Sequence, residues 1–121
     1  IKMIQGSSVD EEVVRQVAAH AEGRKTVLVM LDSNHTHEHV LRELELYSPL
    51  VTPGSYLIVY DTLVEQMPEG MYPNRPWGRG DNPLTAVREF LGRGSDFEVD
   101  GEVEEKLLIT VAPGGYLRRV K

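Results

Sequence analysis

The chain has 121 residues, of which 40% are hydrophobic and 26% charged, a composition typical of one globular domain. Its net charge of -6 argues against nucleic acid or an anionic membrane surface as the main partner, because both require a basic face. The absence of cysteine excludes disulfides and thiolate zinc sites. No apolar run approaches the roughly 20 residues of a membrane span, and no signal peptide is visible, so we expect a cytoplasmic protein.

The first half of the chain predicts alternating strands and helices. Ser8 and Glu11 fit a capping box, in which each side chain bonds the other residue's free amide at the start of a helix. Apolar residues then recur at helical or strand spacing. The predicted elements are a strand over 2–5, a helix between Ser8 and Gly23, strands over 26–31 and 55–60, and a helix over about 37–47.

The second half begins with a long segment, Thr62–Asp81, that is rich in proline and glycine and predicts a functional loop or lid. Asn82 and Pro83 fit the cap and first turn of a third helix. Strands are predicted over 96–100, 106–111 and 116–120, the last two as an antiparallel hairpin. This alternation predicts an α/β fold, a three-layer αβα sandwich with a Rossmann-like, mostly parallel sheet, in a single domain over 1–121.

Two acids follow predicted strands. Asp32 comes directly after the run 26–31, and Asp61 follows the run 55–60. Ligands of open α/β sheets bind at the carboxyl ends of the strands, so two carboxylates there favour a divalent-metal or substrate site. The plainer interpretation is that both acids cap turns or helices, which Asp favours.

Four stretches together resemble a known family. They are Gln5–Ser8, Leu31–His35, Val51–Thr62 and Pro113–Arg119. In order and spacing they resemble the cephalosporin hydroxylase / rhamnosyl O-methyltransferase family, over nearly the whole chain. The resemblance implies a class I methyltransferase fold with a site similar to that of catechol-type O-methyltransferases. It also implies that S-adenosylmethionine methylates a hydroxyl of a small-molecule substrate, a sugar or secondary metabolite.

The resemblance implies a cofactor side of the site. Gly6, Ser7 and Ser8 match the turn that lies against the adenine of the methyl donor, and Asp32 and Ser33 belong to the same side. The alternative for the glycine and serines is a plain strand-to-helix turn with a capping serine. The two interpretations are compatible.

The resemblance also implies a catalytic side. Asp32 and Asp61 match acids that hold Mg²⁺ or a similar divalent cation, which lowers the pKa of the acceptor hydroxyl and orients it. His35 falls where catechol-type enzymes place the base that takes the hydroxyl proton, and imidazoles exchange protons near neutral pH. Further candidates for substrate contacts are Tyr60, Thr62 and Trp77.

The chain departs from the family pattern at two points. Tyr60 stands where the family has the first acid of a pair, which weakens the expected metal site. The glycine-rich loop that binds the donor's methionine part is also missing, and Lys2–Gln5 matches the family's third strand. We therefore expect the chain to be the C-terminal half of such a domain.

Alternatives remain open. A non-catalytic α/β module that does not bind the donor by itself is the main one, and a hydroxylase with Asp32, His35 and His37 as iron ligands is another. We expect His37 and His39 to be solvated near the start of their helix. We also expect the strand ending at Asp32 to be covered, either by Lys2–Ile4 or by a second copy in a homo-oligomer.

Overall fold

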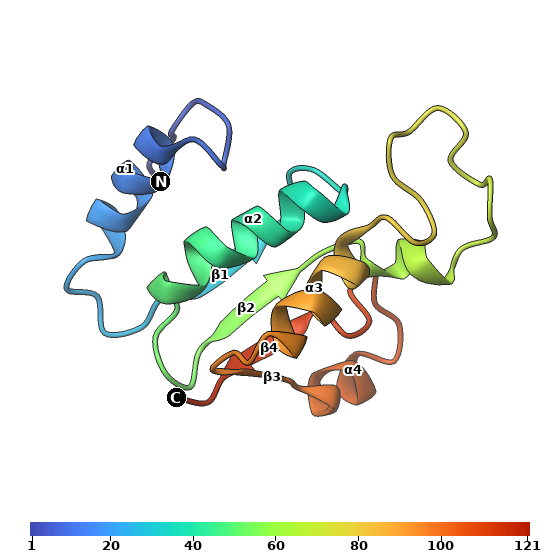
Figure 1. The fold of residues 1–121 in the computed structure, drawn as a ribbon. Helices are drawn as coiled ribbons and strands as arrows, with labels where there is room; N and C mark the ends of the chain where they lie inside the picture. Colours follow the sequence, from blue (N-terminus) through green and yellow to red (C-terminus); the bar gives the residue numbers. More distant parts are fainter.

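The computed structural model describes residues 1–121, which form one four-stranded sheet with helices on both of its sides (Figure 1). The strand order is β1-β2-β4-β3. The elements, in chain order, are α1 (Glu11–Ala21), β1 (Val29–Leu31), α2 (His37–Tyr47), η1 (Ser48–Leu50), β2 (Tyr56–Val59), η2 (Thr62–Gln66), α3 (Pro83–Gly92), β3 (Phe97–Val99), α4 (Gly101–Leu107) and β4 (Tyr116–Arg119).

The sheet is mostly parallel, as predicted. β1 and β2 are parallel, while β4 is antiparallel to both of its neighbours, β2 and β3. Three strands therefore point one way and β4 runs against them. The expected α/β class and the antiparallel C-terminal part are confirmed, although β4 is inserted between β2 and β3 instead of closing a tight hairpin.

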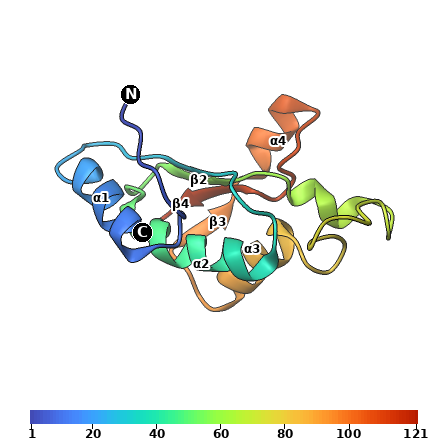
Figure 2. The same ribbon diagram turned by 90° about the horizontal axis from the view of Figure 1, so that it is seen from above.

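The core lies between the sheet and the helices α2 and α3, which share one side, with α4 on the other (Figure 2). Side chains alternate along β2, so that Leu57 and Val59 are buried under the two helices. The opposite face is thinly covered, because α4 is short. Met30 is 60% exposed there, and Leu108 and Ile109 after α4 are 87% and 92% exposed.

Three strand and capping predictions are wrong. Lys2–Gln5 forms no strand and pairs with nothing, so it does not cover the outer edge of β1. The N-cap of α1 is Asp10, which makes no side-chain cap, and Ser8 instead bonds to residues of the loop before α2 and of α2 itself. The apolar run Lys106–Val111 is the end of α4 followed by irregular chain, because Asp100 caps a helix by accepting from the amide of Glu102.

The prediction for α3 is confirmed. The side chain of Asn82 accepts hydrogen bonds from the amides of Leu84 and Thr85, and Pro83 occupies the first turn. The hydroxyl of Thr85 completes a capping box by accepting from the amide of Asn82. Asn82 is fully buried, so the long segment before α3 is fixed where it ends.

Candidate active site

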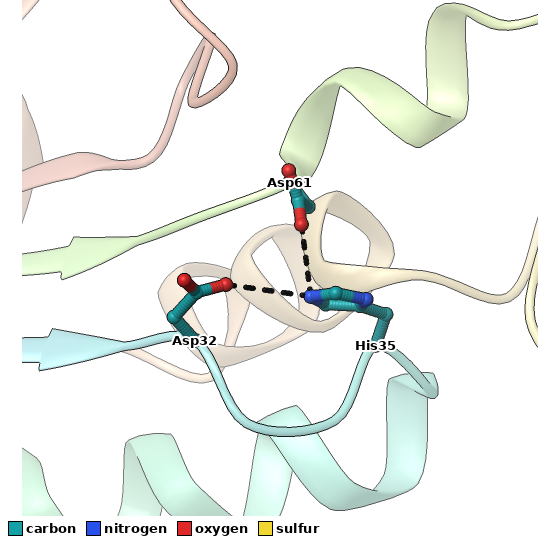
Figure 3. Close-up of side chains that lie close together, drawn as sticks. All are labelled: Asp32, His35 and Asp61. Atoms are coloured by element: carbon teal, nitrogen blue, oxygen red, sulfur yellow. Dashed lines mark ion pairs between the residues drawn. The ribbon is translucent and has the colours of Figure 1, made fainter.

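Two neighbouring strands carry acids to one edge of the sheet. Leu31 is in register with Val59 in the parallel pair β1–β2, so Asp32 and Asp61 emerge at the same end. The turn after β1 then brings His35 back between them (Figure 3). Its Nε2 lies 3.0 Å from Asp61 Oδ2 and 3.5 Å from Asp32 Oδ1.

Asp61 adopts a strained backbone conformation. Its φ of 55° and ψ of 24° place it in the left-handed region, directly before η2. Asp and Asn tolerate this region better than other residues with a side chain. Strain of this kind concentrates at functional sites, where the surrounding structure holds it in place.

The nitrogen between the two acids has no hydrogen-bond partner. His35 Nε2 is buried, and although both carboxylates are near, neither is aligned to bond with it. One ligand atom from each of the three residues lies within 4.8 Å of the others. The two carboxylates are ligands for a divalent cation, and the imidazole nitrogen beside them has two possible roles, as a third ligand, which would favour Mn²⁺ or Fe²⁺ over Mg²⁺, or as a base that takes a proton.

An aromatic cluster borders the same point. The ring of Trp77 meets that of His35 edge to face at 5.1 Å, and Tyr72 packs against Trp77 at 4.8 Å. The guanidinium of Arg75 lies 5.8 Å from the centre of the Trp77 ring. A cavity of about 330 Å³ is lined by Ser33, Asn34, His35, Arg75, Pro76 and Trp77. A larger groove of about 440 Å³ elsewhere on the molecule is lined by none of the predicted site residues.

The loop that carries Trp77 is clamped at its base. The carboxylate of Glu65 accepts hydrogen bonds from the amide of Gly80, at 2.8 Å, and from the side chain of Asn82. These bonds lower the pKa of Glu65 from its ordinary value, the Gly80 amide most. Asp81 accepts from the backbone amide of His37 and so fixes the loop to the start of α2.

Tyr60 and Thr62 do not line the cavity beside His35. The hydroxyl of Tyr60 donates to the sulfur of Met30, on the thinly covered side of the sheet. Thr62 is fully buried, and its hydroxyl has no partner. Of the three residues considered for substrate contacts, only Trp77 therefore lines the cavity beside His35.

His37 and His39 are partly buried and bonded to other side chains, rather than fully solvated as predicted. Nδ1 of His37 bonds with Thr85 and its Nε2 bonds with Glu89, both at 2.8 Å. His39 Nε2 instead reaches Ser8, at 3.1 Å. His37 is directed away from the acids, so the three ligands of the hydroxylase hypothesis are not brought together.

The turn at Gly6–Ser8 lies against the loop that follows β1. Ser8 Oγ is 3.2 Å from Ser33 Oγ, and the Ser8 carbonyl accepts from the hydroxyl of Tyr47 at 2.6 Å. Gly6 has a φ of +143°, and a Cβ there would come within 2.6 Å of Val13, which explains the glycine. The two predicted parts of the cofactor side are therefore adjacent.

Comparison with known proteins places the chain in a family. The model of the rhamnosyl O-methyltransferase/CmcI family matches residues 1–120. A rhamnosyl O-methyltransferase of Mycobacterium tuberculosis (strain ATCC 25618 / H37Rv) is 31% identical over 121 residues, which cover 98% of this chain and 47% of the relative. That of Mycobacterium leprae (strain TN) is 35% identical over 112 residues, covering 89% and 44%. The chain thus spans about half the length of these relatives, and no solved structure matches it.

Proposed function

The chain belongs to the rhamnosyl O-methyltransferase/CmcI family, and on that basis we propose that it carries the cation and acceptor side of an O-methyltransferase. The methyl donor is S-adenosylmethionine, and the acceptor is a hydroxyl of a sugar or secondary metabolite. The name of the relatives makes a rhamnosyl hydroxyl the first acceptor to test.

The convergence of Asp32, Asp61 and His35 is the observation that carries this proposal. In it, the two carboxylates hold a divalent cation, which when bound makes an acceptor hydroxyl more acidic. The unpartnered Nε2 of His35 faces the same point and takes the hydroxyl proton. Trp77 and Arg75 form the wall beside it, where an aromatic face suits the apolar face of a sugar ring.

The proposal is tested by binding. The purified chain is titrated with Mn²⁺ and with S-adenosylmethionine in a calorimeter, beside a full-length relative that serves as a positive control. Asp32→Asn should weaken cation binding, whereas Asp96→Asn, which alters an acid in the groove away from the site, should not. A full-length relative that ignores S-adenosylmethionine would refute the methyltransferase proposal.

A second candidate is a non-catalytic α/β module that does not bind the donor by itself. The exposure of the apolar side chains Met30, Leu108 and Ile109 favours it, since a chain that completed its own fold would bury more of this surface. Donor binding by the full-length relative but not by this chain would identify this case.

Location and assembly are further proposals. No helix in the structure is long and apolar enough to cross a bilayer. The cytoplasmic location stays a prediction. The homo-oligomer also stays a prediction. The observation in its favour is that the outer edge of β1 is unpaired in the sheet, so a second copy could pair with it.

A further inference from the structure

Glu43 is a buried carboxylate on the inner face of α2. The residue is 1% exposed, and only one of its oxygens has partners, the hydroxyl of Ser33 at 2.7 Å and, in a longer ion-pair contact, Nε2 of His39 at 3.6 Å. Burying a carboxylate with an unpaired oxygen costs more than one hydrogen bond returns, so leucine would suit folding better at this position. A destabilising residue beside a candidate site points to a role in function.

The hydroxyl of Ser33 connects Glu43 to two further groups. A serine has a single hydroxyl proton, and Ser33 donates it to Glu43. The Ser33 oxygen can then only accept, and its neighbours are Ser8 Oγ at 3.2 Å and His39 Nε2 at 3.3 Å. Ser8 Oγ and His39 Nε2 are themselves 3.1 Å apart. Glu43 therefore makes Ser33 an acceptor toward both neighbours, while the direction of the bond between Ser8 and His39 depends on the histidine tautomer.

The cluster joins two segments that are far apart in the sequence. Ser8 ends the turn on the donor side, and Ser33 directly follows the acid Asp32. Tyr47, one turn after Glu43, adds a bond to the Ser8 carbonyl. Burial, and the charge of Glu43, raise the pKa of Tyr47, so its hydroxyl stays a donor. One face of α2 thus holds both segments.

We propose that Glu43 and His39 are positioning residues that fix the donor-side turn, Gly6–Ser8, to the loop after β1 that carries Asp32 and Ser33. Binding of the methyl donor would then favour binding of the cation, and the reverse. This inference rests on the proposed function. Coupling between two binding sites is reciprocal, so the donor should raise the affinity for the cation by the same factor as the cation raises the affinity for the donor. Replacing Glu43 should abolish this coupling between donor and cation binding while leaving Asp32 and Asp61 in place.

The test compares Glu43→Leu, Glu43→Gln and the wild type. Donor affinity is measured by calorimetry with and without Mn²⁺, and the melting temperature is recorded for each protein. Leucine should weaken donor binding in the presence of Mn²⁺ about tenfold and abolish the coupling, with a melting temperature that is equal or higher. Glutamine should restore binding, because its carbonyl oxygen accepts from Ser33. Glu38→Leu, on the exposed side of the same helix, is the matched control.

Each result has a distinct meaning. Equal donor affinity and coupling in the wild type and Glu43→Leu would overturn the inference alone. So would a loss of binding that comes with a lower melting temperature, since that would indicate a purely structural role. A wild-type protein, and a full-length relative, that bind neither ligand would refute the proposed function and the inference with it.

Discussion

Replacing Asp61 with Asn tests the candidate cation site most directly. The ligand oxygens of Asp32 and Asp61 lie within 4.8 Å of each other, so a cation held between these carboxylates would sit about 2 to 2.6 Å from each oxygen, after small side-chain adjustments. A unit charge at that distance attracts a divalent cation by about 3 kcal/mol even at the dielectric constant of water. Asn keeps one oxygen ligand, so we expect a loss of about half that energy, or roughly tenfold weaker binding.

The substitution should leave the fold intact. Asn tolerates the left-handed backbone of residue 61, where φ is 55°. It also removes the repulsion between the carboxylates of Asp61 and Asp32 when no cation is bound, so the melting temperature without metal should be unchanged or slightly higher. The affinity for the cation should therefore fall while the melting temperature without metal does not.

The chain provides its own reporter for this experiment. Trp77 is the only tryptophan, and its ring is 5.1 Å from that of His35. Quenching of its fluorescence by Mn²⁺ gives the affinity of the wild type, of Asp61→Asn and of the control Asp96→Asn. Equal Mn²⁺ affinity in all three proteins would show that no cation is held between these acids, and the reasoning from their convergence would be wrong.

Three other changes have defined outcomes. The hydrogen bonds that lower the pKa of Glu65 stabilise the fold above the pKa of about 4.3 that the group has in the unfolded chain. This stabilisation disappears as the pH falls through the lower pKa of the folded state. Trp77 fluorescence should therefore show a transition in that pH range, and Glu65→Gln should lack it. Gly115→Ala puts a Cβ 2.2 Å from a backbone carbonyl oxygen at the end of β2 and should cost about 1–3 kcal/mol in urea unfolding, whereas Gly92→Ala, with open space, should not. His35→Gln should slow methyl transfer at least ~100-fold with a smaller change in Mn²⁺ affinity; a loss of affinity as large as that of Asp61→Asn would make the imidazole a ligand instead.

The acid pair was predictable from the sequence because it depends on local rules. Strands with apolar runs end at Asp32 and Asp61, and parallel neighbours bring such ends together. The cap at Asn82 is equally local. The run Lys106–Val111 was not predictable in this way, because its apolar residues fit a strand and a helix end alike, and the cap at Asp100 decided between them.

Glu43 was missed for a different reason. It lies between the apolar positions Val40, Leu44 and Tyr47, where helical spacing already placed the buried face of α2. A charged residue at such a position is the available signal, because carboxylates are almost never fully buried without a partner. Its hydrogen-bond partner, Ser33, lies ten residues earlier, beyond the reach of helical periodicity, whereas its ion-pair partner, His39, lies one helical turn earlier and within that reach.

His35, His37 and His39 show how the start of one helix organises this site. If the stretch were a strand, His35, His37 and His39 would share one side, and if it were all helix, His35 and His39 would. The helix begins at His37, after Thr36, and neither arrangement occurs. His35 lies before the helix and faces the acids, while His37 and His39, about 200° apart around the helix axis, face α3 and the donor-side turn. A shift of the helix start by one residue would therefore displace all three contacts together.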